Sequence, residues 1–392
     1  MSCFYMNALR TAWRVARNAA VGCCSCGGIL CAAIHEPLAS QAAPTPPPDL
    51  TAAVAEFGNK YIARRPEAAL VIGVYQNGRS FVQGFGHCST TNSAAPDAQT
   101  FFEVGSITKV FTGVLLGRLA GEGAIRLTDP IRLYLPAGTT PPQRDGREIT
   151  LVDLATHTSG LPRLPGNFNA VATDPQNPYA QYDQKTLFAS VGSAKLSTRP
   201  GQTSLYSNYG FALLGQLLAR KTGIPYDALL AEKVCQPLGL TNTVVALSPS
   251  LEARLAPGHS PQGKVVPNWD LAAFAPAGAL KSDAADLLRF LEANLNPART
   301  PLAAALTLAQ QPHFKKNGSA IGLAWQIANN SGAQPIYWHN GGTGGYVSFM
   351  GFVPNAQAGI VLLSSYGDVW AGDRTLDEAG MRLLKLAARS AQ

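Results

Sequence analysis

The sequence predicts an α+β fold in which one antiparallel sheet is built from both ends of the chain, with helices on its faces and a helical lobe inserted between its strands. Two observations predict it. Near each end, short runs rich in β-branched and aromatic residues alternate with turn residues and lie next to a helix-periodic segment. Between them, residues from about 107 to 300 have mainly helical periodicity. With 392 residues, 46% of them hydrophobic, the chain can bury a large core.

Residues 1–42 are typical of a signal peptide. Three arginines precede an uncharged apolar stretch, residues 19–34, and small residues follow up to Ala42. We expect cleavage near Ala42, which would make the mature protein periplasmic or secreted, with no stable membrane span. An uncleaved anchor is the alternative, although residues 19–34 are short for a span of about 20 residues. Five of the seven cysteines lie in this segment, and whether Cys88 and Cys235 pair stays open.

A Pro-rich linker over residues 43–49 separates this segment from the predicted folded domain, residues 50–392. Apolar residues at helical spacing from Leu50 to Tyr61 predict a first helix, with Asp49 as a candidate N-cap.

A β-hairpin is predicted next. A β-rich run over residues 69–75 is followed by Asn77-Gly78, a pair that favours the positive φ angles of a tight turn, and the run then resumes at residues 81–82. Within the helical lobe, Pro/Gly-rich loops cover residues 161–178 and 256–279. Loops of this length tend to line functional sites.

Near the C-terminus, three strand-like runs are separated by turn residues, at 336–338, 346–353 and 359–363. A closing helix is predicted over residues 376–387. These runs complete the sheet that the N-terminal hairpin begins.

The formal charge of +7 comes from 31 Lys and Arg against 24 Asp and Glu. The basic residues form no run longer than pairs such as Arg64-Arg65, so we expect no nucleic-acid partner. The six histidines show no close ligand spacing, so we expect neither a metal nor a cofactor.

Ser106 and Lys109 form the single Ser-x-x-Lys match in the chain, at the start of an apolar helical run. Positions i and i+3 share a helix face, so the Ser106 hydroxyl and the Lys109 amine can meet there. The N–H groups of a helix amino terminus also favour a developing anion. The pattern therefore places a nucleophile, a nitrogen base and an oxyanion donor within one turn.

Tyr206 and Asn208 form a Tyr-x-Asn match in a loop that precedes an apolar helix. The phenol could relay a proton, and the amide could contact substrate. Two other Tyr-x-Asn matches lie in the expected signal peptide and in the hairpin turn, so neither keeps a functional interpretation. Lys221-Thr222-Gly223 is interpreted as an ordinary helix end, because Lys in the last turn and Gly after it are stop signals.

Residues 339–345 read His-Asn-Gly-Gly-Thr-Gly-Gly directly after a predicted strand. A glycine-rich strand edge lets a ligand's backbone approach closely. The Gly342 N–H could then pair with the Ser106 N–H as an oxyanion hole. A dinucleotide site is not predicted here, because the residues that follow are strand-like rather than helical.

In this order, the three elements resemble the penicillin-recognising serine hydrolases: class C β-lactamases, AmpH-type DD-carboxypeptidase/endopeptidases, related DD-peptidases and esterases of the same fold. Residues 102–109, 154–161 and 200–210 reinforce the resemblance, which covers about residues 50–388. It implies a serine β-lactamase/DD-peptidase-like fold with the active site between sheet and lobe.

The resemblance also implies the role of each site residue. Ser106 would be the acylated nucleophile, with its own N–H and that of Gly342 as the oxyanion hole. Lys109 and Tyr206 would form the base system, and which of them accepts the proton stays open. Asn208 would contact a substrate amide. The remaining residues expected to bind substrate are His339, Asn340 and Gly341.

Two features of the resemblance limit what it implies. His339 stands where class C β-lactamases have Lys, so a permanent cation becomes a group charged only partly near neutral pH. His157 and Ser159 match a recurrent segment of the family outside its catalytic set, so we expect them to be loop structure.

For the substrate, export and the AmpH-like pattern favour D-Ala-D-Ala peptides of peptidoglycan, with β-lactams as ligands that acylate the same serine. Three alternatives remain: a class C-like β-lactamase, an esterase of this fold, and a penicillin-binding protein without turnover.

Overall fold

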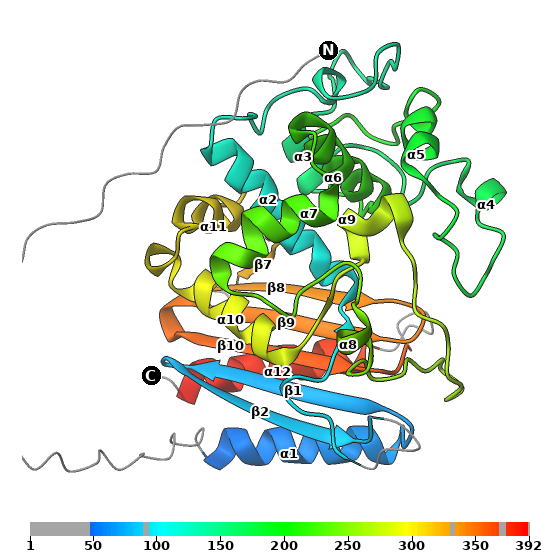
Figure 1. Ribbon diagram of the computed structural model, residues 1–392. Coiled ribbons are helices and arrows are strands. Elements are labelled where there is room, and N and C mark those ends of the chain that lie inside the picture. The colour runs from blue at the N-terminus through cyan, green and yellow to red at the C-terminus, as the bar shows by residue number, and fades with distance from the viewer. Residues whose placement is uncertain (1–47, 89–93, 330–333, 368–373, 391–392) are drawn as a thin grey trace, which may run out of the picture. The chain divides into compact units, whose positions relative to one another are not determined.

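The computed structural model describes residues 48–88, 94–329, 334–367 and 374–390. The expected signal peptide and all but the end of the expected linker lie outside these residues. Figure 1 shows a sheet with helices on both faces and a group of further helices on one side of it. The predicted α+β architecture is therefore confirmed.

Eight strands form one sheet in the order β2-β1-β10-β9-β8-β7-β6-β5, and every neighbouring pair is antiparallel. The strands are β1 Ala69–Gln76, β2 Arg79–Gly86, β5 Phe314–Lys316, β6 Ser319–Ile321, β7 Gln326–Asn329, β8 Pro335–Gly342, β9 Val347–Val353 and β10 Ala358–Ser364. Asn77 and Gly78 have φ angles of 48° and 82°, as the predicted hairpin turn requires. Strands β5 to β7 were not predicted, because each has only three or four residues.

Strands from both ends of the chain pair with each other within the sheet, next to its β2 edge. β1 pairs with β10 along its length, from Leu70 opposite Ser364 to Gln76 opposite Ala358. All residues of β9 and β10 are buried. Such continuous apolar strands are expected where both faces of a sheet are covered.

Helices α1 (Pro48–Ala63) and α12 (Thr375–Ser390) cover one face of this sheet (Figure 1). Leu50 and Val54 of α1 are fully buried in the layer between helices and sheet. Asp49 lies inside the first turn of α1, so it is not the N-cap that the sequence suggested.

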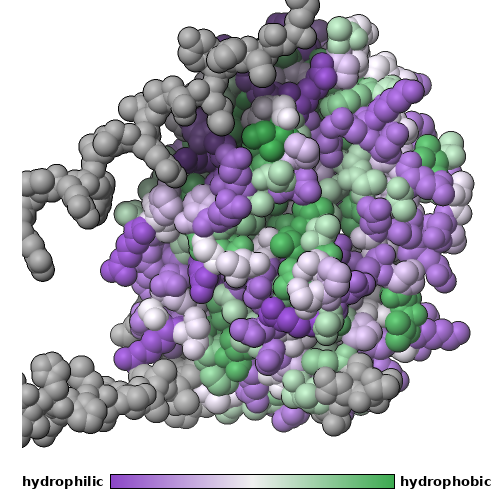
Figure 2. Space-filling model, in the orientation of Figure 1, coloured by the Kyte–Doolittle hydropathy of each residue, from purple (hydrophilic) through white to green (hydrophobic). Residues whose placement is uncertain are grey.

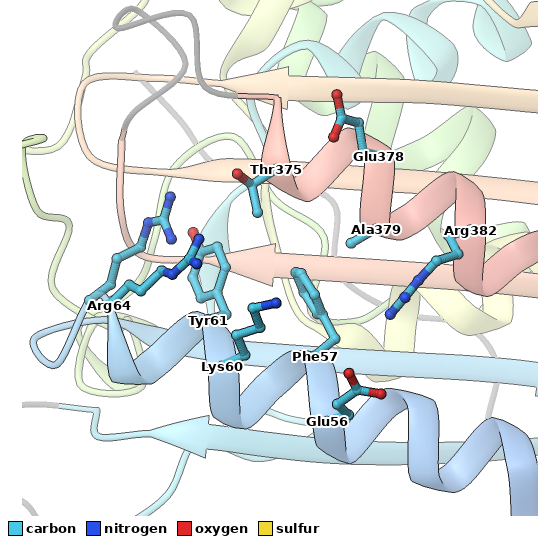
Figure 3. A pocket seen from close by; sticks show the side chains of 10 residues that line it. Glu56, Phe57, Lys60, Tyr61, Arg64, Thr375, Glu378, Ala379 and Arg382 are labelled. Carbon is cyan, nitrogen blue, oxygen red and sulfur yellow. The ribbon is translucent and has the colours of Figure 1, made fainter.

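A surface cavity lies between α1 and α12 (Figure 3). Phe57 and Tyr61 line it together with the basic side chains of Lys60, Arg64 and Arg382. It shares no lining residue with the cavity that opens at Ser106.

The opposite face is covered by α10 (Ala284–Leu295), whose leucines fit against glycines of the sheet. A Cβ at Gly73 would lie 2.9 Å from the Leu288 side chain, and one at Gly359 would lie 3.1 Å from Leu291. Although α10 falls within the range expected for the helical lobe, it packs as a layer on the sheet.

The helical lobe packs beyond α10 and contains both short and long helices. Its members are α2 Thr108–Gly121, α3 Leu151–Ala155, α4 Phe168–Val171, α5 Gln184–Val191, α6 Asn208–Thr222, α7 Tyr226–Leu230, α8 Pro249–Glu252, α9 Ala275–Gly278 and α11 Ala303–Gln310. A two-stranded sheet, β3 (Phe102–Glu103) with β4 (Lys281–Ser282), leads into α2. Gly223 ends α6 with a φ of 73°, which confirms Lys221-Thr222-Gly223 as a helix end.

The surface of the described residues shows no single dominant feature in the view of Figure 2, where apolar areas are interrupted by hydrophilic side chains. No helix in the described ranges combines the length and apolarity needed to cross a membrane. Cys88 and Cys235 are both free thiols, so the question that the sequence left open is answered: they do not pair.

An aromatic stack joins the lobe to the layer on the sheet, and its removal should be costly. Phe111 of α2 and Phe290 of α10 are fully buried, with ring centroids 4.1 Å apart. We expect Phe111→Ala to lower the free energy of unfolding by about 3–5 kcal/mol, because it removes apolar contacts and leaves a cavity. Urea denaturation followed by circular dichroism measures the loss. Leu133→Ala is the control, since Leu133 is 53% exposed; equal effects of the two substitutions would contradict the prediction.

Candidate active site

Ser106 lies in a short 3₁₀ turn, Gly105–Ile107, between β3 and α2. Gly105 has a φ of 49°, and a Cβ there would lie 2.6 Å from the Gly342 nitrogen. A side chain at Gly105 is therefore excluded both by its backbone conformation and by β8. The turn is fixed on its other side by Thr108, whose hydroxyl accepts a hydrogen bond from the Leu280 N–H at 3.0 Å.

Two side chains contact the Ser106 hydroxyl. Lys109 Nζ lies 2.9 Å from Ser106 Oγ, and the Tyr206 hydroxyl donates to the same oxygen at 2.6 Å. Lys109 Nζ also donates to the Ala277 carbonyl at 2.6 Å. Lys109 and Tyr206, which belong to motifs about 100 positions apart, thus both contact the Ser106 hydroxyl oxygen.

The amine of Lys109 is fully buried at the start of α2. Burial holds its pKa well below the ordinary value of 10.5, and the positive charge of Arg163 lowers the pKa further. Aromatic rings flank the amine, with Nζ 4.9 Å from the ring centroid of Tyr206 and 5.7 Å from that of Phe211. Burial and the charge of Arg163 favour the neutral amine, the form that can accept a proton.

Tyr206 precedes α6 and is held by the N-cap of that helix. The Ser207 hydroxyl accepts from the Gly210 N–H at 2.9 Å and donates to the Pro162 carbonyl at 2.7 Å. Burial raises the pKa of Tyr206 to about 12, although the Ser106 hydrogen bond and the charge of Arg163 act in the opposite direction. The side chain is therefore a phenol near neutral pH and can donate to Ser106.

His157 is a neighbour of Tyr206 that the sequence analysis placed outside the catalytic set. Its ring centroid lies 4.4 Å from that of Tyr206, and its Nδ1 accepts the Ser207 N–H at 3.0 Å. Burial lowers the pKa of His157 well below 6.5, with the charge of Lys109 as the next cause. It is loop structure as expected, with a φ of 60°, yet it is a neutral ring that supports Tyr206. The only sign of this role in the sequence was that His157 lies in a segment that recurs in the family.

His339 faces the lobe from β8 and is almost completely buried. Its Nδ1 lies 2.6 Å from the Asn340 carbonyl. Burial lowers the pKa of His339 to about 4, and the charge of Lys109 contributes. The side chain is therefore neutral near pH 7, rather than partly charged as its ordinary pKa suggested.

Asn340 lies on the opposite face of β8, because successive side chains alternate along a strand. Its amide donates to the Asp377 carboxylate of α12 at 2.7 Å. The side chain points to the helix layer that contains α12 and does not line the cavity at Ser106. This geometry corrects the expectation that Asn340 contacts substrate.

Gly341 and Gly342 bring the β8 backbone against the nucleophile turn. A Cβ at Gly341 would lie 2.0 Å from the Val104 carbonyl oxygen and 3.0 Å from the Ser106 nitrogen, so a side chain is excluded. Gly341 thus allows close packing of two protein segments. Gly342 lies next in the strand and lines the same cavity as Ser106.

A narrow cavity opens at Ser106, between the lobe and the end of β8. The residues that line it are Ser106, Arg163, Tyr179, Asn208, Trp269, Leu271, Phe274, Ala277, Gly278, Gly342 and Thr343. Arg163 and Trp269 come from the two long loops that the sequence analysis expected to line a site. Neither residue was singled out from the sequence, because neither belongs to a motif.

Glu103 supports the cavity wall three residues before the nucleophile. Its carboxylate accepts the Trp269 N–H at 2.9 Å, and burial raises the pKa of Glu103. It holds the loop that carries Trp269. Throughout the described ranges, no three His, Cys, Asp or Glu side chains converge in a way that could hold a metal ion.

The low pKa of His339 predicts how stability depends on pH. The folded pKa of about 4 lies below the ordinary value of 6.5, so the unfolded chain binds more protons between these pH values. The free energy of unfolding should therefore fall as pH is lowered from about 6.5 to 4, with a contribution from His339 of up to about 3 kcal/mol. Urea denaturation at several pH values measures it.

His339→Asn isolates this contribution. Other groups titrate in the same range, among them Asp283, whose pKa burial raises to about 6 and whose effect on stability has the opposite sign. The difference between wild type and His339→Asn cancels these groups. The variant should lose less stability than wild type over this range; identical pH profiles would show that His339 is not the cause.

Comparison with known proteins identifies relatives that match most of the chain. The family described as Beta-lactamase matches residues 59–383. The D-alanyl-D-alanine-carboxypeptidase/endopeptidase AmpH of Escherichia coli (strain K12) is 32% identical over 310 residues, which cover 75% of this chain and 78% of the relative. A beta-lactamase of Pseudomonas fluorescens is 28% identical over 333 residues, covering 76% of this chain and 88% of the relative.

Two solved structures share the fold. The beta-lactamase/D-alanine carboxypeptidase from Pseudomonas syringae has a TM-score of 0.73 and 24% identity, and covers 86% of this chain and 99% of its own. The corresponding protein from Yersinia pestis, complexed with citrate, has a TM-score of 0.74 and 24% identity, and covers 88% and 99%. The expected serine β-lactamase/DD-peptidase-like fold is confirmed. The chain belongs to the beta-lactamase family and is a serine hydrolase.

Proposed function

We propose that the protein is an exported acyl hydrolase that acts through a Ser106 acyl-enzyme on D-Ala-D-Ala peptides of peptidoglycan, and that β-lactams acylate the same serine. The observation that carries the proposal is the position of Ser106 Oγ between Lys109 Nζ and the Tyr206 hydroxyl. Export rests on the expected signal peptide, residues 1–42. An intact N-terminus on protein purified from its natural source would contradict cleavage near Ala42.

In acylation, we propose Lys109 as the general base. The lowered pKa of Lys109 supports this role, whereas the raised pKa of Tyr206 argues against a phenolate. Ser106 Oγ forms a bond to the substrate carbonyl carbon while its proton passes to Lys109. The N–H groups of Ser106 and Gly342 bind the developing oxyanion. As the amide bond breaks, the proton on Lys109 passes through the Tyr206 hydroxyl to the leaving amine.

In deacylation, water replaces Ser106 as the nucleophile and Ser106 becomes the leaving group. A water molecule attacks the acyl carbon and loses its proton to neutral Lys109, either directly or through the Tyr206 hydroxyl. The bond from the carbon to Ser106 Oγ breaks, and Ser106 regains a proton from Lys109. His157 positions the Tyr206 ring for both steps, because it packs against that ring and holds the Ser207 N–H.

The substrate preference rests on relatives. The 32% identity with a carboxypeptidase/endopeptidase favours D-Ala-D-Ala peptides. A neutral buried His339 is a poor replacement for a lysine that would bind a substrate carboxylate, but D-Ala-D-Ala peptides and β-lactams both carry this group, so His339 does not separate the two. A second candidate is a class C-like β-lactamase, which the 28% identity with such an enzyme favours. An esterase is a third, because a site without a cation at position 339 also suits neutral esters.

Intact-protein mass spectrometry with a penicillin tests the proposal. We expect a mass increase equal to one penicillin that persists while little drug is consumed, and we expect Ser106→Ala to abolish it, because the nucleophile is gone. A short-lived adduct with rapid drug loss would instead indicate a β-lactamase. A permanent adduct, with no turnover of D-Ala-D-Ala peptides, would indicate a binding protein. An unchanged adduct in Ser106→Ala would contradict the mechanism.

The role of Lys109 predicts the pH dependence of acylation. The rate should rise with pH through the Lys109 pKa and level off well below pH 10.5, since only the neutral amine accepts the proton. Lys109→Arg should lower the acylation rate by at least about 100-fold at every pH, because guanidinium stays protonated. Lys195→Arg is the control at an exposed position. A Lys109→Arg rate within about threefold of wild type would exclude Lys109 as the base.

A further inference from the structure

Arg163 is a cavity residue that the proposed mechanism does not use. It lies in the loop after α3, and its guanidinium carbon is 5.1 Å from the ring centroid of Tyr206. Its carbonyl accepts the Tyr209 N–H at 3.0 Å, which anchors the loop to the first turn of α6. The side chain lines the cavity together with Ser106 and Asn208. The backbone of Arg163 is therefore anchored to α6, and its guanidinium lies over Tyr206 in the cavity that opens at Ser106.

Arg163 supplies the positive charge of this cavity. Among the described residues that line it, Arg163 alone is charged near neutral pH. Lys109 and His339 lie behind the cavity, and burial favours the neutral form of both. A substrate entering the cavity therefore meets one permanent cation, and this cation is on the lobe rather than on β8.

The surroundings of Arg163 suit a carboxylate. Tyr179, Trp269 and Phe274 form an aromatic wall of the same cavity, with ring centroids 5.1–5.4 Å apart for the pairs that involve Tyr179. Apolar walls limit the access of water, which strengthens a hydrogen bond between ions. A guanidinium presents parallel N–H groups that match the two oxygens of a carboxylate.

We propose that Arg163 binds a carboxylate of the substrate, so that the enzyme prefers acyl donors that carry an anionic group near the scissile bond. The inference rests on the proposed acyl-enzyme function of Ser106 and adds the residue that selects among its substrates by their charge. The carboxylate belongs either to the acyl half, which stays on Ser106, or to the leaving half. The two sources share one chemistry and are distinguished by experiment.

The test uses two pairs of D-alanine aryl esters in which a carboxylate is replaced by a carboxamide of the same shape. In the first pair, the acyl half is N-succinyl-D-alanine or its terminal amide, with phenol as leaving group. In the second pair, N-acetyl-D-alanine is esterified to 3-carboxyphenol or to 3-carbamoylphenol. For each pair, the measured quantity is the kcat/KM of the acid divided by the kcat/KM of its amide.

We expect a ratio of about 10 or more in one pair for wild type, and a ratio near 1 in that pair for Arg163→Leu, because a charge-assisted bidentate contact is lost. Arg163→Lys should keep part of the preference. Arg220→Leu is the matched control: it removes one exposed positive charge from the end of α6, away from the cavity, and should leave the ratio unchanged. The pair that responds identifies the half that carries the carboxylate.

The use of a ratio separates binding of the carboxylate from the effect of Arg163 on the base. The charge of Arg163 also lowers the pKa of Lys109, so its loss should shift the pH profile of acid and amide alike to higher pH. That shift cancels in the ratio at each pH. Two outcomes therefore have distinct meanings. Turnover that survives in Ser106→Ala overturns the acyl-enzyme function itself. Turnover that depends on Ser106, with ratios unchanged in Arg163→Leu, overturns only the role of Arg163.

Discussion

Lys109 is completely buried in the first turn of α2, and this burial is the constraint on which the rest of the site depends. Desolvation disfavours an ammonium ion, so it favours the neutral amine. The amine is oriented by the Ala277 carbonyl on one side and by Ser106 on the other. Because α2 is apolar on nearly all sides, it packs into the lobe core without a solvent-facing stripe. The helix that positions Lys109 is therefore also the one that keeps water from it.

Several groups able to carry positive charge are gathered around Ser106, and each affects the others. A protonated Lys109 would lower the pKa values of His157 and His339, and the charge of Arg163 lowers those of Lys109 and His157. Burial is the larger cause in every case. Among the described residues, the result is one permanent cation at the cavity, Arg163, with the three neutral groups Lys109, His157 and His339 behind it. Such an arrangement separates the binding of an anion from the acceptance of a proton, two tasks that a single charged lysine could not perform together.

Local features of this fold could be predicted from sequence, whereas features that depend on distant pairing could not. The Asn77-Gly78 hairpin and the helix end at Gly223 depend on backbone preferences of a few residues, and both were predicted. The contact between Ser106 and Lys109 follows from their spacing of three residues. The side chain of Asn340 could not be placed from the sequence, because its direction depends on which face of β8 packs against α12. The same holds for the contact between His157 and Tyr206, made by segments about 50 residues apart.

The glycines at the end of β8 have a different main role in the structure from the one that the sequence suggested. The sequence suggested that its glycines let a ligand approach. In the structure, most of them allow close packing against other segments of the protein. Gly341 packs against the Val104 carbonyl, Gly344 against the Trp269 ring and Gly345 against Gly258. These contacts bring β8 against the nucleophile turn and against the loop that forms the cavity wall. The glycines thus set the distance between the two halves of the site, and the ligand is left with the space that they define beside Gly342.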